Sequence, residues 1–269
     1  MPSSGNQGGV VFVGIAPHPP VMVPEVGRAE SAQVSASVAA VAALAERVCA
    51  SGAETLVLIS PHAPLDERAF VAYDDAMVCG DFRTFRAPEV RVRASVDAVL
   101  LDAIGEAAEE ESLLIERATG FKLDHGTTVP LYFLQHGGWR GPVVTLGYSF
   151  LPNEAHLRFG SCIRAGAERI GRRVAFVASA DLSHRLARGA PAGYDPDAHR
   201  FDEEVVDAIR DGRPERIIEM DQALRRRAGE CGYNSIVVAL GVAEGRPRCA
   251  EVLHYEAPFG VGYLVAQIA

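Results

Sequence analysis

The sequence has no apolar run near the roughly 20 residues that a membrane-spanning helix needs. Its start, Met1 to Gly9, also lacks the basic residues and apolar stretch of a signal peptide. We therefore expect no membrane contact, and a disordered tail over residues 1–9. The five cysteines are scattered and form no C-x-x-C pair. This pattern argues against a disulfide framework and a zinc knuckle, and it fits the reducing cytoplasm.

Several catalytic motifs are missing as well. The sequence contains no H-E-x-x-H, G-x-S-x-G, P-loop or G-x-G-x-x-G motif, so phosphoryl transfer, serine hydrolysis and dinucleotide binding lack their usual residues. A formal net charge of −9 offers no electrostatic footprint for nucleic acid. The basic run at 225–227 is flanked by acidic residues, and we interpret it as a solvated helix face.

The residues that are present describe a globular α/β protein. Hydrophobic residues make up 48% and charged residues 23% of the 269 positions, so residues 10–269 are expected to form a single domain. Short β-branched runs alternate with amphipathic segments, which predicts a mixed central sheet with helices on both faces. The predicted strands are Val10–Ala16, Thr55–Ser60, Val143–Tyr148, Val174–Ala178 and a C-terminal hairpin of Cys249–Tyr255 with Val261–Ile268. The predicted helices cover Ala29–Cys49, Val96–Ala107, Phe201–Ile209, and Asn153–Ile170 with Asn153 as the N-cap.

Three histidines follow predicted strands directly. His18 and His62 each lie in a Pro-His-x-Pro sequence, and His184 follows Val174–Ala178 through a short polar turn. Prolines fix the backbone, so each of the first two imidazoles is expected on a stiff corner. The carboxyl ends of strands in an open α/β sheet are the usual ligand site. A single histidine there is more often structural, but two proline-framed histidines favour a shared site.

Five further histidines stand in other contexts, of which His254 has no feature that suggests a role. His125 enters an apolar segment directly after Asp124, which either orients the neighbouring loop or caps the helix that follows. His156 and His199 fall in polar, helical segments and are expected to face solvent. His136 has no comparable context. Since two histidines with one carboxylate are typical of non-haem Fe(II) oxygenases, nearby carboxylates are the expected third ligand.

Five motifs occur in an order that resembles the catalytic (LigB-like) subunit of class III extradiol ring-cleavage dioxygenases. They are Pro17–Pro20, Ser60–Pro64, Leu123–Thr127, Ser179–His184 and Gly229–Gly232. The closing segment Tyr255–Tyr263 resembles the version found in the AmmeMemoRadiSam gene set.

The resemblance implies a function and a set of site residues. It places Fe(II) on His18, His62 and Glu230, an acid/base on His184, and His125 against the substrate. The implied reaction opens a catechol-like or aminophenol-like ring beside its oxygens, with O2 as co-substrate. A homodimer is the assembly that base rates favour.

Memo-type proteins share this fold and the paired histidines but place a cysteine where the carboxylate is expected. Here Glu230 and Cys231 are adjacent, so either ligand set is open. A thiolate favours softer ions such as copper or zinc, whereas a carboxylate suits oxygen activation by iron. We expect Glu230 to be the ligand. The alternative function is a Memo-like metal-binding or interaction protein without ring cleavage.

Overall fold

The computed structural model describes residues 8–246 and 249–269. Residues 1–7 of the predicted tail therefore lie outside the described part, and Gly9 already begins a strand. The strands are β1 Gly9–Ala16, β2 Thr55–Ser60, β3 Ala69–Tyr73, β4 Met77–Phe82, β5 Ala87–Ser95, β6 Leu114–Ala118, β7 Val143–Gly147, β8 Arg173–Ser179, β9 Glu251–Glu256 and β10 Tyr263–Gln267. The α-helices are α1 Pro24–Gly27, α2 Ser35–Ala50, α3 Ala98–Glu110, α4 His125–His136, α5 Asn153–Arg169, α6 His199–Arg210, α7 Glu215–Ile218, α8 Gln222–Ala228 and α9 Tyr233–Ala243. Three 3-10 segments are η1 Pro20–Met22, η2 Arg28–Val34 and η3 Arg83–Phe85.

The described strands form one large sheet and one small one. The large sheet has eight strands in the order β6-β3-β7-β2-β8-β1-β10-β9, and β4 pairs with β5 separately. Its centre is parallel, because β7, β2, β8 and β1 all run the same way. β3 joins β7 and β10 joins β1 in the opposite direction. The predicted mixed sheet is confirmed.

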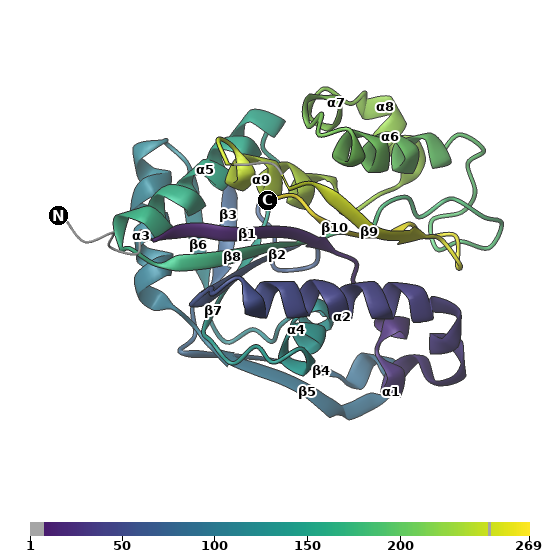
Figure 1. Cartoon of the computed structure of the whole chain (residues 1–269), viewed down its shortest axis with the longest axis horizontal. Coiled ribbons are helices and arrows are strands. Elements are labelled where there is room, and N and C mark those ends of the chain that lie inside the picture. Colours follow the sequence, from purple (N-terminus) through teal and green to yellow (C-terminus); the bar gives the residue numbers. More distant parts are fainter. Residues whose placement is uncertain (1–7, 247–248) are drawn as a thin grey trace.

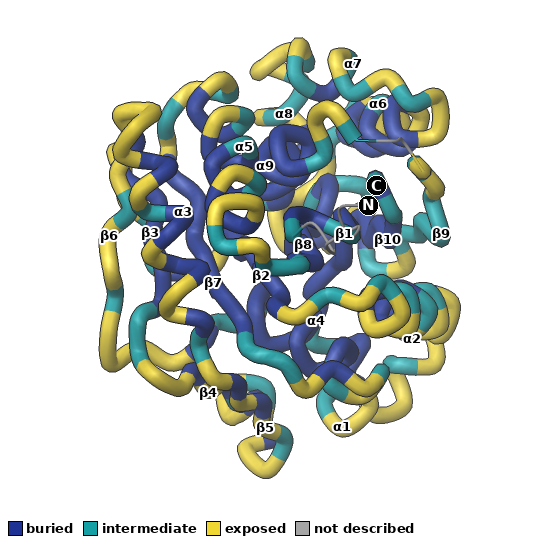
Figure 2. The backbone as a smooth tube through the Cα atoms, turned by 60° about the vertical axis from the view of Figure 1, so that its left-hand side comes forward, coloured by how far each residue is buried: buried dark blue, intermediate teal, exposed yellow. Residues whose placement is uncertain are grey.

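Helices cover both faces of this sheet (Figure 1). One hydrophobic core joins the sheet to α3, α5, α6 and α9, and a second joins it to α2, α4 and the β4–β5 pair. Neighbouring strand residues alternate between the two: Val57 and Ile59 face the first core, whereas Leu56 and Leu58 face the second. The central strands are buried throughout (Figure 2), which explains why they are continuously apolar.

The predicted strands are all present, within a few residues of the expected bounds. β9 and β10 form the expected antiparallel hairpin. Four strands were not predicted, β3 to β6. β5 carries mostly polar residues at its exposed positions, and the edge strand β6 is largely exposed, so neither of these two has the uniform apolar run of the central strands.

Two details of the helix predictions were wrong. The helix predicted from Ala29 becomes regular α-helix only at Ser35, after η2. Asn153 is not an N-cap, since that position belongs to Pro152 and the Asn153 amide donates to the Ile218 carbonyl and the Tyr233 hydroxyl.

One continuous helical stretch, Pro24–Ala50, is long and apolar enough to cross a membrane by length and composition alone. Its α2 segment packs against the sheet through Val41, Leu44, Ala45 and Val48, all buried in the second core. One face of α2 therefore belongs to the core of the α/β fold.

Candidate metal centre

The candidate site lies at the carboxyl ends of three neighbouring strands. β1, β8 and β2 are adjacent and parallel, so the residues that follow them emerge at one edge of the sheet. His18 follows β1, His62 follows β2, and Asp181 and His184 follow β8. Strand order in the sheet, which the sequence does not display, therefore brings these residues together.

His18 is held in one tautomer. Its ring is buried, and its Nδ1 lies 2.8 Å from the Ser179 hydroxyl. That hydroxyl donates its single proton to the Gly126 carbonyl, so it must accept from Nδ1–H of His18. Nε2 is then left with a lone pair. Burial and the neighbouring histidines hold the pKa of His18 well below its usual range, so the ring is neutral.

His62 faces His18 across the site. The two Nε2 atoms are 3.1 Å apart and the rings are nearly perpendicular. The backbone N–H of His62 donates to the Ser60 hydroxyl, which donates to Asp124. Burial lowers the pKa of His62 to about 4, so this imidazole is also a neutral donor near pH 7.

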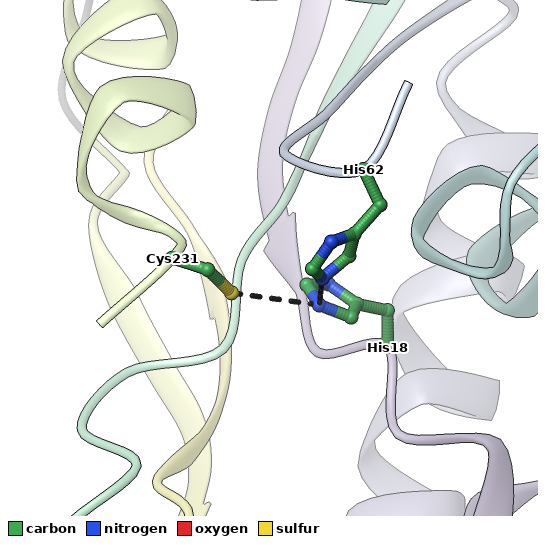
Figure 3. Close-up of side chains that lie close together, drawn as sticks. All are labelled: His18, His62 and Cys231. Atoms are coloured by element: carbon green, nitrogen blue, oxygen red, sulfur yellow. Dashed lines mark hydrogen bonds between the residues drawn. The ribbon is translucent and has the colours of Figure 1, made fainter. Parts of the chain in front are cut away.

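Cys231 supplies the third converging donor atom (Figure 3). Its sulfur lies 3.6 Å from His18 Nε2 and 3.9 Å from the Asp181 carbonyl oxygen. Close backbone contact holds this turn in place: a side chain at Gly232 would come within 2.5 Å of Ala180, because the turn lies against the end of β8. Burial raises the pKa of the Cys231 thiol, and a cation at the site would oppose that shift.

These separations fit a single ion. His18 Nε2, His62 Nε2 and Cys231 Sγ all lie within 4.8 Å of one another. With bonds of about 2.0 Å to imidazole and 2.3 Å to thiolate, the donors around a near-tetrahedral ion stand about 3.3–3.6 Å apart. The described donor set is therefore two imidazole nitrogens and one cysteine sulfur.

Glu230 points to other partners. Its Oε1 accepts from Arg225 Nε at 3.2 Å, and its Oε2 accepts from the Tyr233 backbone N–H at 2.8 Å. Arg225 also lies 3.5 Å above the Tyr233 ring and donates to the Asn234 side-chain oxygen. The interpretation of residues 225–227 as a solvated face was wrong for Arg225, because a buried carboxylate and an aromatic ring hold it.

Asp181 lies directly behind His18. One carboxylate oxygen accepts from the His18 backbone N–H at 2.9 Å, and the other is 3.5 Å from His18 Nε2. Burial raises its pKa to about 7. Sequence reasoning gave no role to Asp181 or Ser179, although both stand in the motif that contains His184.

His125 and His184 flank the converging donors. The His125 ring stacks on His62 with centroids 4.3 Å apart. His184 donates through Nδ1 to the Leu182 carbonyl at 2.9 Å, which leaves its Nε2 as a free base. Burial lowers the pKa of both imidazoles.

The alternatives for Asp124 are both realised. It caps α4 by accepting from the Thr127 backbone N–H, and it orients the loop of His62 through Ser60. His156, expected to face solvent, is fully buried, and its two ring nitrogens lie 3.1 and 3.0 Å from the carbonyl oxygens of Pro152 and Ser149. His199 is exposed, as expected.

A cavity of about 410 Å³ opens beside the cluster. His18, His62, His125, His184 and Asp181 form its polar side. Its remaining walls come from η1, η2, the loop between β8 and α6, the turn between β9 and β10, and the first residue of β10. The lining residues outside the polar side are Pro19, Pro20, Val21, Glu30, Pro191, Phe259, Val261 and Tyr263.

Residues 13–266 match the family described as the catalytic LigB subunit of aromatic ring-opening dioxygenase. The chain belongs to this family. Family membership agrees with the five motifs and with the observed α/β fold.

Two curated relatives of this LigB-family chain are similar in sequence. Protein CA_C1420 of Clostridium acetobutylicum is 34% identical over 264 residues, which cover 94% of this chain and 56% of that protein. A MEMO1 family protein of Archaeoglobus fulgidus is 26% identical over 134 residues, covering 50% of this chain and 48% of the relative. The chain thus spans about half the length of the curated relatives it matches.

A solved structure shares the fold. The crystal structure of the uncharacterized protein JW3007 from Escherichia coli K12 matches with a TM-score of 0.60 at 16% identity. The match covers 85% of this chain and 92% of that one, so nearly the whole LigB-family architecture is common to both.

Proposed function

We propose that this chain is a Memo-like metal-binding protein of the LigB family, with one transition-metal ion on His18, His62 and Cys231. The convergence of these three donor atoms carries the proposal. Two imidazoles and a thiolate favour softer ions such as copper or zinc over the Fe(II) expected from the sequence. Glu230, the expected carboxylate ligand, instead accepts hydrogen bonds from Arg225 and from the Tyr233 backbone N–H at the start of α9.

The surrounding groups suit chemistry on a small molecule in the cavity. When bound, the ion would orient an oxygen-bearing ligand and stabilise negative charge on it. His184, with Nε2 free and its pKa lowered, is the group able to take up or return a proton there. His125 packs on His62 and forms one wall beside the ligand.

Ring cleavage of a catechol-like or aminophenol-like substrate with O2 is the second candidate function. Family membership and the placement of His184 beside the cavity favour it. His184→Ala would then retain the metal and the aromatic ligand while turnover falls by roughly 10²- to 10⁴-fold. A variant that loses the metal would instead make His184 a ligand.

One experiment separates the candidates. The purified chain is loaded anaerobically with Fe(II), Zn(II) or Cu(I), its metal content is measured, and oxygen uptake is followed with a panel of catechols. Tight Zn(II) or Cu(I) binding without oxygen uptake supports the Memo-like function. Catechol-dependent oxygen uptake in the Fe(II) form supports ring cleavage. Failure to bind any of the three ions contradicts both.

We also infer a cytoplasmic location. The five cysteines form no disulfide, and a reduced Cys231 thiolate is required for the proposed ligand set.

A further inference from the structure

We propose that the cavity beside the metal centre binds amine-bearing aromatic molecules, whose positive group pairs with Glu30, and that it discriminates against carboxylated ones. The inference rests on the proposed function, since it takes this cavity to be the ligand site.

The cavity wall contains no permanently positive side chain. Among the described residues that line it there is neither lysine nor arginine. Arg185 is the nearest in sequence to a lining residue, but its guanidinium lies against Gly229 and donates to the Arg226 carbonyl. A carboxylate on the part of a ligand remote from the metal would therefore lose hydration without gaining a counter-charge.

The middle of the cavity suits a flat ring. Pro19, Pro20 and Pro191 present rigid, apolar surfaces, and Phe259 and Val261 complete them. The turn that carries the last two is fixed by backbone bonds, from Leu186 N–H to the Gly260 carbonyl and from Gly262 N–H to the Ser183 carbonyl. Rigid walls lose little entropy when an aromatic ring binds.

Two acidic residues line the cavity, and they differ in availability. Asp181 is buried under His18 and accepts its backbone N–H. Glu30, on η2, is exposed, and its side chain forms no hydrogen bond or ion pair with another described residue. Glu25 on α1, by contrast, accepts from the Tyr132 hydroxyl and does not line the cavity. Glu30 is thus the carboxylate placed to pair with a ligand ammonium group.

The test compares three catechols that differ mainly in charge at the end of the side chain. These are 4-(2-aminoethyl)catechol, neutral 4-methylcatechol and 3,4-dihydroxyphenylacetate. Binding is measured anaerobically by calorimetry on the full chain, both metal-free and loaded with redox-inert Zn(II). We expect the amine to bind about tenfold more tightly than the carboxylate, with the neutral compound between them. The difference should shrink as ionic strength rises.

Variants assign the preference to Glu30. Glu30→Gln should remove most of the advantage of the amine, Glu30→Arg should favour the carboxylate, and the control Glu25→Gln should keep the wild-type ranking. Equal affinities, a tighter carboxylate, an unchanged ranking in Glu30→Gln, or no binding of any catechol would overturn the inference. Failure of the chain to load Zn(II) would instead count against the proposed metal site, and the ranking in the metal-free protein would still decide the inference.

Discussion

The two histidine turns and the turn that carries Glu230 and Cys231 reach the same site by different means. His18 and His62 leave the ends of β1 and β2, strands buried on both faces and separated only by β8. The Glu230–Cys231 turn joins α8 to α9 and lies against the site from outside the sheet. The sheet itself thus positions the first pair of donors, whereas side-chain interactions select the third.

Arg225 makes that selection. Its guanidinium stacks on Tyr233 and bonds to Glu230, and the first turn of α9 takes the other carboxylate oxygen. Cys231, one residue later, then faces His18. Of two adjacent residues that could each bind a metal, one can therefore be held away from the site by a cation on the helix that precedes the turn.

Removal of a strand-end histidine should have the largest effect. His18→Ala or His62→Ala should weaken Zn(II) binding by on the order of 10³-fold or more, since each donor supplies a large share of a binding free energy of about 10–16 kcal/mol. Equilibrium dialysis with metal analysis measures this, with the exposed His199→Ala as the control. Full metal occupancy in the His18→Ala/His62→Ala double variant would refute the site.

Replacing Cys231 and Glu230 one at a time tests directly which of them is the third ligand. Cys231→Ser should weaken Zn(II) binding by about 10²-fold or more and remove the thiolate charge-transfer absorption of the Co(II) form. Glu230→Gln should retain both, while unfolding becomes easier by roughly 1–3 kcal/mol because Arg225 loses a charged partner. The opposite pattern would make Glu230 the ligand, as the sequence led us to expect.

The sequence was sufficient for the parts of the site that follow strands. Continuous apolar runs located β1, β2 and β8, and proline-framed histidines at two of their ends pointed to a shared site. It was not sufficient for Cys231, because the sequence does not show that Arg225 and the Tyr233 backbone N–H turn Glu230 away from the histidines. Ser179 and Asp181 were missed for a similar reason: their roles depend on contact with His18, more than 160 positions away. The available signal was a Ser-x-Asp sequence at the end of an apolar strand.

Asp202 supports the turn after β8 and should make stability depend on pH. It accepts from the Ser183 backbone N–H and the Tyr255 hydroxyl, and burial raises its pKa to about 6 from 3.8. Because the pKa of Asp202 is higher in the folded protein than in the unfolded chain, its protonation stabilises the fold fully below pH 3.8. This stabilisation is lost as the pH rises through about 6. Relative to wild type, Asp202→Asn should therefore gain up to about 3 kcal/mol in unfolding free energy between pH 4 and pH 8. Urea denaturation at the two pH values measures it, and a constant difference would contradict the assignment.

The smallest effect is expected from Ser179→Ala, which leaves every proposed ligand in place. Ser179 accepts from His18 Nδ1 because its own proton goes to the Gly126 carbonyl, and this arrangement alone directs the His18 lone pair to Nε2. Without the hydroxyl, part of the population should carry its proton on Nε2, so metal affinity should fall about 10- to 100-fold. Nitrogen NMR of the metal-free imidazole should show the second tautomer directly.

Ser183→Ala is the matched control for this tautomer argument. Ser183 is equally buried after the same strand, but its hydroxyl donates to the Ala198 carbonyl and does not contact His18. Equal losses of affinity in both variants would mean that the end of β8 is merely destabilised. A loss confined to Ser179→Ala, together with the second tautomer, would show that the strand-end turns set the protonation of their ligand as well as its position. The turn at Cys231 needs no hydrogen bond of this kind, because a thiolate has a single donor atom and no tautomers.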